Sequence, residues 1–191
     1  MIIGDATILA IESQITKAYE RSSELALGFF VVYVKGECYG VRNPEATLLA
    51  SSVDAVKRRI ARRGEHTVPF DPESEAAVIA DAYIAATYDQ NRQAERFLGM
   101  SSDTFRDALI AKDIIWAPDG DAAFDDGGHI LQFDVGGRVR VIGFRNSDEQ
   151  LGMDRDVSDV WIGSDHFYEL LIKWETAFQK ERTAAIGIGS A

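Results

Sequence analysis

The sequence predicts an α+β protein, with antiparallel strands near both ends of the chain and helices mainly between them. Residues 25–34 are rich in aromatic and β-branched side chains, and residues 129–144 hold two apolar segments joined by two glycines. Between these regions, residues 49–60 repeat apolar side chains at helical spacing. Because the chain has 191 residues, of which 46% are hydrophobic and 27% charged, we expect one domain with a proper hydrophobic core.

The first 41 residues are expected to form strands. Residues 7–15 show the two-residue periodicity of a strand, and residues 25–41 fit a β-hairpin with Lys35 and Gly36 in its turn. The two hairpins, at residues 25–41 and 129–144, are expected to build the antiparallel sheet. An exposed edge of the first strands is also where a second copy of the chain would pair in a homodimer.

Three helices are expected in the middle of the chain. Two begin where a capping residue precedes a proline, at Asn43-Pro44 and at Asp71-Pro72, since the first helical position needs no N–H. The second of these is alanine-rich, which favours close packing, and a third spans residues 102–109. Basic side chains before a glycine complement the carbonyl groups that end the first helix: Lys57, Arg58, Arg59, Arg62 and Arg63.

Residues 129–144 predict a β-hairpin whose strands have two possible registers. A two-residue turn at the glycines places Phe133 opposite Arg140, which brings a charge into the apolar face. A three-residue loop instead places Phe133 opposite Val141 and Asp134 opposite Arg140. We therefore expect the second register, with one face on the core and one salt-bridged face in water.

A final helix is expected after residue 163, with Ser164 or Asp165 as its cap. Its apolar face carries Phe167, Leu170, Leu171, Trp174 and Phe178, so the helix has a structural role. The segment 183–191 is small and glycine-containing, and we expect it to fray. The expected domain thus covers residues 1–191 with a frayed end.

The formal net charge is −11, from 20 basic and 31 acidic side chains. Such a charge repels nucleic acid and anionic membranes, so it argues against both as partners. Residues 1–112 hold 16 acidic and 13 basic side chains, whereas residues 113–191 hold 15 and seven. Because aspartate favours turns, we expect most of the following acids in loops: Asp113, Asp119, Asp121, Asp125, Asp126, Asp134, Asp148, Glu149, Asp154, Asp156, Asp159 and Asp165.

Several functional classes are disfavoured by features that the sequence lacks. The longest apolar run, residues 25–34, is too short to cross a membrane, and no basic secretory signal opens the chain, so we expect a cytoplasmic protein. Cys38 is the only cysteine, which rules out an internal disulfide. No motif of a phosphate, dinucleotide or zinc-protease site occurs, and we expect no cofactor and no metal.

The aspartate-rich stretch 119–130 is the best candidate for metal binding or catalysis. It does not fit an EF-hand loop, because Ala123, Phe124 and Ile130 occupy three positions that need other residues. Aspartate and glycine before a strand are ordinary turn residues, which favours a structural role. The alternative is a metal-dependent hydrolase or small-ligand enzyme that uses Asp119, Asp121, Asp125 and His129. A surface adaptor or scaffold is a third possibility.

Three segments together resemble the bacterial Immunity protein 42 family: MIIGDATILAIE at the start, WAPDGDAAFDDGGHILQFDVGGRVRVIGF at residues 116–144 and DHFYELLIKWETAF at residues 165–178. Residues 43–112 match less clearly. Members of this family are small proteins encoded beside polymorphic toxins. The resemblance implies a protein that binds and neutralises a cognate toxin and catalyses no reaction itself.

The charge independently favours a toxin that is basic or has a basic active-site surface, since clustered carboxylates can imitate phosphate. The expected partner-binding residues are Asp119, Asp121, Phe124, Asp125, Asp126, Asp154, Asp156, Asp159 and Trp161. Trp116, Phe124 and Trp161 flank the acids as candidate anchors, although a core position is the favoured alternative for the first two. Structural roles are expected for Gly4, which permits a bend, Asp5, which accepts backbone N–H groups, Trp116 and Trp174.

Overall fold

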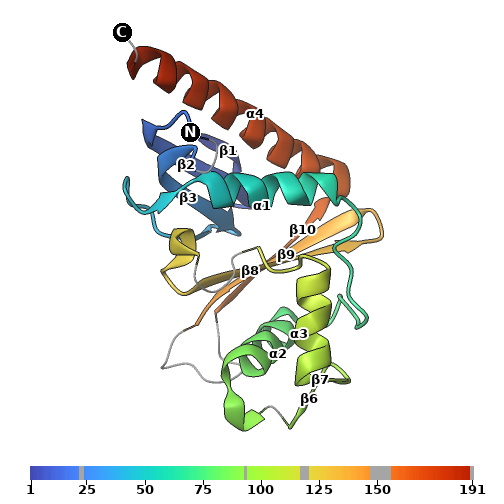
Figure 1. Cartoon of the computed structure of the whole chain (residues 1–191). Coiled ribbons are helices and arrows are strands. Elements are labelled where there is room, and N and C mark those ends of the chain that lie inside the picture. The colour runs from blue at the N-terminus through green and yellow to red at the C-terminus, as the bar shows by residue number, and fades with distance from the viewer. Residues whose placement is uncertain (22–23, 93, 117–120, 147–155, 190–191) are drawn as a thin grey trace.

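The computed structural model describes residues 1–21, 24–92, 94–116, 121–146 and 156–189. Two main antiparallel sheets and four α-helices confirm the α+β class. Figure 1 shows the amino-terminal sheet beneath α4 and α1, and the carboxyl-terminal sheet crossing the middle of the molecule above α2 and α3. The hairpins from the two ends of the chain therefore form separate sheets rather than one.

The amino-terminal sheet has the strand order β1-β2-β3-β4, and β5 pairs with the start of β3. Helices α1 and α4 pack with this sheet in one apolar cluster, in which Phe30, Val53 and Trp174 are fully buried. The predicted strands in this region are confirmed, and β1 is an additional strand. The elements are β1 (Ile2–Asp5), β2 (Leu9–Ala18), β3 (Ala26–Val34), β4 (Glu37–Tyr39), β5 (Thr47–Leu48), α1 (Ala50–Ala61) and α4 (Ser164–Gly189).

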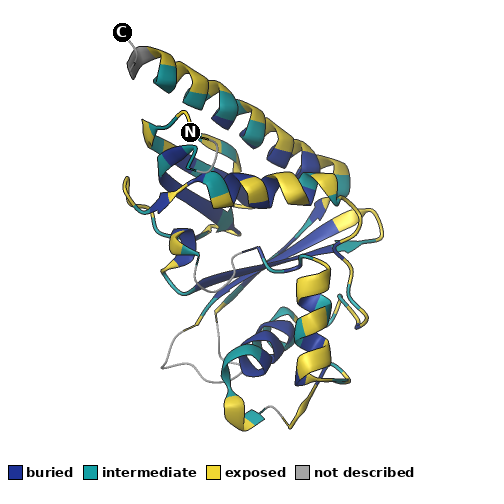
Figure 2. Cartoon of the chain, viewed as in Figure 1, coloured by how far each residue is buried: buried dark blue, intermediate teal, exposed yellow. Residues whose placement is uncertain are grey.

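The carboxyl-terminal sheet has the strand order β10-β9-β8, and both of its faces are covered. One face adds Ile130 and Val141 to the cluster of the amino-terminal sheet, and the other packs Leu131 and Phe133 against α2 and α3. Figure 2 shows most of this sheet in the colour of buried residues. The elements are α2 (Ala76–Tyr88), η1 (Gln90–Arg92), β6 (Arg96–Phe97), β7 (Met100–Ser101), α3 (Ser102–Ala111), η2 (Ala122–Phe124), β8 (Gly128–Val135), β9 (Arg138–Arg145) and β10 (Val157–Gly163).

The register of the β8–β9 hairpin differs from the prediction. Phe133 pairs with Arg140 across a two-residue glycine turn. The predicted pairs, Phe133 with Val141 and Asp134 with Arg140, do not form. The prediction was wrong because it assumed that one hairpin face meets water, whereas both faces are buried: one face joins the cluster of the amino-terminal sheet, and α2 and α3 cover the other, the face of Phe133 and Arg140. The guanidinium of Arg140 is accommodated there because it donates to both carboxylate oxygens of Asp159, at 2.9 and 2.8 Å, and to two backbone carbonyls before α2.

The helix starts predicted at the two prolines are displaced. Helix α1 begins at Ala50 rather than after Asn43, and α2 begins at Ala76 rather than after Asp71. The side chains of Asn43 and Asp71 instead accept the backbone N–H two residues further on, at 3.1 and 2.9 Å, which closes a turn. Residues 47–48 then pair with β3, so the first helix cannot begin before them.

Two segments near the end of the chain are more regular than predicted. Residues 157–163, expected within acidic loops, form β10 along β9. Helix α4 includes residues 183–189, where a frayed tail was predicted. The guanidinium of Arg182 holds this part of the helix, since it donates to the carbonyls of Leu25, at 3.0 Å, and Tyr19.

The alanine-rich helix packs closely, as predicted. Helix α2 lies against α3, β9 and β10, and seven of its residues are buried: Ile79, Ala80, Ala82, Tyr83, Ile84, Ala85 and Ala86. Among the described residues, no helix combines the length and apolar character that crossing a membrane requires.

Glu12 on β2 forms an ion pair that makes stability depend on pH. Its carboxylate accepts from Arg42 and Tyr33, both at 2.8 Å, and the Arg42 contact lowers the pKa of Glu12. The unfolded chain therefore binds more protons than the folded chain in acid, so this stabilisation is present above the unfolded pKa and lost as pH falls through the folded one.

The variant Glu12→Gln should therefore have a Tm that depends less steeply on pH between about 3 and 5. Circular dichroism melts of the wild type and of Glu12→Gln test this, with the exposed Glu45→Gln as a control. Identical pH slopes for all three proteins would show that the pair contributes nothing to folding.

Candidate functional site

Two segments that carry acidic side chains reach the same end of the carboxyl-terminal sheet. Gly128 at the start of β8 pairs with Arg145 at the end of β9, and Val157 at the start of β10 pairs with Phe144. Residues just before β8 and β10 therefore lie at the end of the sheet opposite the glycine turn. We call this region the acidic end and define it by Asp121, Asp125, Asp126 and Asp156.

The acids of this region differ in exposure. Asp125 and Asp156 are exposed, whereas Asp121 is half-buried and its Oδ1 accepts the N–H of Ala123 at 3.0 Å, which caps η2. Two further predicted residues, Asp119 and Asp154, lie outside the described residues. Asp125 and Asp156 are thus the described predicted acids most open to a partner.

Asp126 is engaged within the chain. Its Oδ2 accepts from the N–H of Gly40, at 3.0 Å, and from Arg145, at 3.3 Å, and its Oδ1 accepts from the N–H of Gly128 at 3.0 Å. These contacts join the turn after β4 to the start of β8. Asp126 therefore has a structural role that the sequence did not predict.

Asp159 and Trp161 lie further along β10, away from the acidic end. The charge of Asp159 is matched by Arg140, whose side chain is only 4% exposed. The guanidinium groups of Arg138 and Arg140 lie 4.4 and 5.2 Å from the ring centroid of Trp161. Each of these arginines is paired with a carboxylate, Arg140 with Asp159 and Arg138 with Glu73 at 3.4 Å, so the charges around Trp161 are balanced. Trp161 is half-buried and lines a separate pocket of about 290 Å³ with Ile8.

The other flanking aromatic residues belong to the core. Phe124 is 6% exposed and packs edge-to-face against Phe30, with ring centroids 6.2 Å apart. Trp116 is 2% exposed, and the fully buried Trp174 donates its indole N–H to the hydroxyl of Ser13 at 3.1 Å. Phe124 thus has the core position that was the alternative to an anchor, and its side chain offers a partner little contact area in this conformation.

Gly4 and Asp5 are the last two residues of β1. Gly4 has a φ of +108°, and a Cβ atom there would lie 2.4 Å from the carbonyl oxygen of Leu9, so only glycine fits. The carboxylate of Asp5 accepts from the N–H and the hydroxyl of Thr7, and these contacts lower the pKa of Asp5. Both residues shape the β1–β2 turn.

A cleft that the sequence analysis did not identify lies between α1 and the chain around the end of α3. It has a volume of about 430 Å³. The sequence could have indicated this cleft through Ile110, an apolar residue that does not lie on the buried face of α3. In the structure its side chain is 66% exposed. We call this space the α1–α3 cleft, and it is lined by Ser51, Asp54, Ala55, Arg58, Leu109, Ile110, Asp113, Ile115, Trp116 and Asp121.

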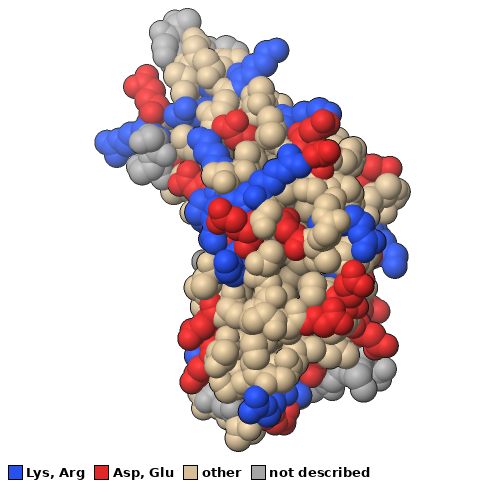
Figure 3. Space-filling model, turned by 90° about the vertical axis from the view of Figure 1, so that its right-hand side faces the viewer, with Lys and Arg blue, Asp and Glu red and all other residues tan. Residues whose placement is uncertain are grey.

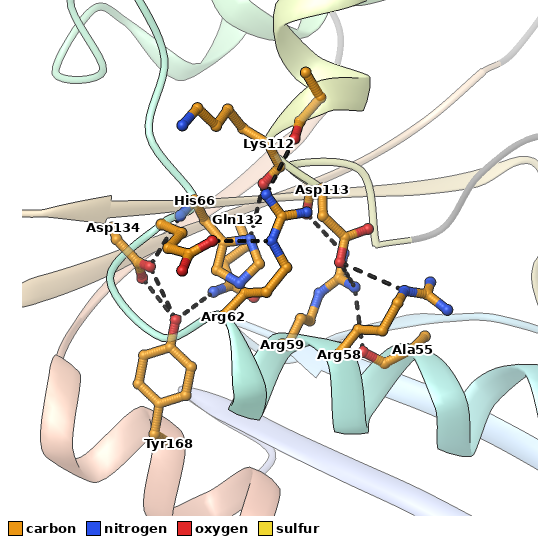
Figure 4. Close-up of polar contacts among 12 residues, drawn as sticks. Ala55, Arg58, Arg59, Arg62, His66, Lys112, Asp113, Gln132, Asp134 and Tyr168 are labelled. Carbon is orange, nitrogen blue, oxygen red and sulfur yellow. Dashed lines mark hydrogen bonds and ion pairs between the residues drawn. The ribbon is translucent and has the colours of Figure 1, made fainter.

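Two arginines of α1 neutralise one carboxylate of this cleft (Figure 4). Arg58 and Arg59 lie 3.7 and 3.6 Å from Asp113. Arg59 is fully buried with its guanidinium 5.0 Å from the ring of Trp116, and burial lowers the pKa of Arg59 to about 10. Arg59 therefore lies in the last turn of α1, as the sequence predicted, and its burial gives it a structural role as well.

A second polar group next to the cleft holds the two halves of the fold together (Figure 4). The carboxylate of Asp134 on β8 accepts from the hydroxyl of Tyr168 on α4, at 2.9 Å, and from the N–H groups of Gly64 and His66. Gln132 donates to the same hydroxyl at 3.0 Å. The carboxylate of the half-buried Asp134 is therefore engaged by hydrogen bonds within the chain.

Acidic and basic side chains lie interspersed on part of one face of the molecule (Figure 3). Figure 3 shows red and blue atoms interspersed over the upper half of the face that it draws, and a broad tan region below. The excess of acid in the sequence therefore does not produce a single negative surface on this face.

Of the residues of the alternative metal or enzyme site, Asp119 lies outside the described residues, and Asp125 and His129 differ in exposure. The ring of His129 stacks on that of Phe144, with centroids 5.4 Å apart, and lies near Tyr83, whereas Asp125 is exposed. Within the described ranges, no three His, Cys, Asp or Glu side chains form a group that could hold a metal ion. Burial raises the pKa of the Cys38 thiol, which disfavours the reactive thiolate.

The fold resembles that of CdiI from Burkholderia dolosa, with a TM-score of 0.54 and 14% sequence identity over 93% of this chain and 99% of that chain. No curated protein matches the chain. The sequence matches the family described as Immunity protein 42 over residues 1–177. The chain therefore belongs to the Immunity protein 42 family, and its function is to neutralise a toxin.

Proposed function

We propose that the protein binds its toxin through the acidic end and catalyses no reaction of its own. The observation that supports this best is that Asp125, before β8, and Asp156, before β10, reach the same end of one sheet and are both exposed. With a net charge of −11, these carboxylates favour a basic surface on the toxin and disfavour nucleic acid as a partner.

Exposed acids of this kind act mainly on the rate of association. Their charges are screened over roughly 8 Å at physiological salt, so they attract a basic partner during approach and contribute little to the final contact energy. The acidic end is therefore proposed to accelerate toxin capture.

The proposal predicts that inhibition is stoichiometric. The toxin domain encoded by the adjacent gene, titrated with this protein, should lose all activity at an equimolar ratio, and co-expression should restore growth. An enzyme that acts on the toxin or on its product would turn over many molecules, so it would protect at a far lower molar ratio of this protein to toxin. Protection at such ratios, or no protection at all, would contradict the proposal.

Charge reversal tests the surface itself. The double variant Asp125→Lys/Asp156→Lys should bind the toxin with an association rate lowered about tenfold at low salt, and with a weaker salt dependence. Stopped-flow or biolayer interferometry at several salt concentrations measures both quantities. Asp126 is left unchanged because its carboxylate holds the backbone of Gly40 and Gly128.

The matched control is Glu20→Lys, an exposed reversal after β2 in the other sheet. It should change the association rate only through the total charge. The double variant reverses two charges and the control reverses one. If the association rate of the double variant falls no more than twice as much as that of the control on a logarithmic scale, the acidic end does not face the toxin.

A further inference from the structure

We infer that the α1–α3 cleft receives a lysine or arginine side chain of the toxin and anchors the complex there. This inference rests on the proposed function, because it assumes a basic toxin bound next to the acidic end. It adds a second contact, which adjoins the acidic end at Asp121 and has a different effect on binding.

The lining of the cleft matches the two parts of such a side chain. Ile110, which is 66% exposed, and the half-buried Ile115 provide the accessible apolar surface, and the buried Leu109 and Trp116 lie beneath it. Lysine and arginine carry an apolar stem and a charged head, and they bury the stem when the head finds a polar partner. A cleft of about 430 Å³ also falls within the range of roughly 300–1,000 Å³ that is typical of binding pockets.

The charges of the cleft favour a cationic head. Three carboxylates line it, from Asp54, Asp113 and Asp121, against one lining cation, Arg58. Arg58 and the buried Arg59 lie 3.7 and 3.6 Å from the Asp113 carboxylate, so this carboxylate is neutralised within the protein and does not attract the partner. Asp54, which is exposed on α1, and Asp121 remain on the two sides of the cleft to attract a guanidinium or ammonium group.

The cleft is continuous with the acidic end. The short helix η2 has Asp121 at its amino end, in the cleft, and Asp125 at its carboxyl end. A toxin surface held at the acidic end is therefore placed beside the cleft. Interface energy is usually concentrated in a few anchors that lose contact with water, whereas rim charges affect association.

The test separates these two roles by kinetics. The probe is the toxin domain encoded by the adjacent gene, freed from its co-expressed complex with the full chain. Asp54→Lys and Ser51→Trp change exposed α1 residues in the cleft, by charge and by bulk, and circular dichroism melts confirm that each variant is folded. Both should raise the dissociation rate about tenfold or more.

The matched control is Asp107→Lys, the same reversal at an exposed position of α3 that does not line the cleft. It should dissociate within about twofold of the wild type. In addition, alanine variants of each toxin lysine and arginine, combined with Asp54→Ala, should reveal one toxin residue whose effect is lost when Asp54 is absent.

The dissociation rates of the cleft variants decide whether the α1–α3 cleft anchors the toxin. Faster dissociation of both cleft variants but not of Asp107→Lys supports the inference. Dissociation of Asp54→Lys at the rate of the wild type or of the control overturns it, while the slower association of Asp125→Lys/Asp156→Lys would leave the proposed function in place. If the wild type itself does not bind the toxin, the proposed function and the inference fail together.

Discussion

Replacing Trp174 with alanine should lower the free energy of unfolding by about 3–5 kcal/mol. The side chain is fully buried between the amino-terminal sheet and α4, and its ring lies 5.1 Å from that of Phe30 and 5.4 Å from that of Phe178. Alanine would leave a cavity and would also deprive the buried hydroxyl of Ser13 of its donor. Guanidinium denaturation followed by circular dichroism measures the change.

The control for this variant is Ile172→Ala on the same helix, where the side chain is 48% exposed. It should cost less than about 1 kcal/mol, because a half-exposed side chain leaves no cavity. Trp174→Phe should fall between the two, since it keeps most of the volume and loses the hydrogen bond. A Trp174→Ala variant as stable as Ile172→Ala would mean that α4 does not complete the core.

Replacing Gly28 with alanine should destabilise the protein by about 3 kcal/mol or more. A Cβ atom at Gly28 would lie 1.8 Å from the carbonyl oxygen of Gln14, which is a backbone atom of the paired strand β2 and cannot rotate away. The strands would have to separate next to the irregular pairing between Ile15 and Lys17. Thermal and chemical denaturation should both show this loss.

Gly163→Ala provides the matched control in another strand. A Cβ atom there meets nothing within 4 Å, so alanine should change the free energy of unfolding by less than about 1 kcal/mol. If both glycine variants are equally stable, the close approach of β2 and β3 at Gly28 is not a constraint on the fold.

Local patterns predicted the existence of most elements. The strands at residues 7–15 and 25–41, the helix over residues 102–109 and the apolar face around Trp174 all follow from periodicity within one segment. The two helix starts at prolines were wrong because an Asx turn uses the same residues as a helix cap, and only the pairing of residues 47–48 with β3 distinguishes them.

The candidate site was predicted only in part. The positions of Asp125 and Asp156 at one sheet end agree with an acidic surface, because both flank strands that pair with β9. Asp126 and Asp159 could not be told apart from them, since an aspartate that meets an arginine across the fold has the same local sequence as an exposed one. The α1–α3 cleft joins segments distant in sequence and leaves almost no local signal.

The amino-acid sequence by itself determined the α+β class, the core positions of individual helices and strands, the acidic excess and the resemblance to an immunity protein. These properties depend on composition and on neighbours within a few residues. Only the tertiary structure decided which faces of the carboxyl-terminal sheet are buried, which hairpin register results and which acids remain exposed. Those outcomes depend on helices and arginine side chains from distant parts of the chain that pack against the sheet. The spacing of residues within one segment does not predict such contacts.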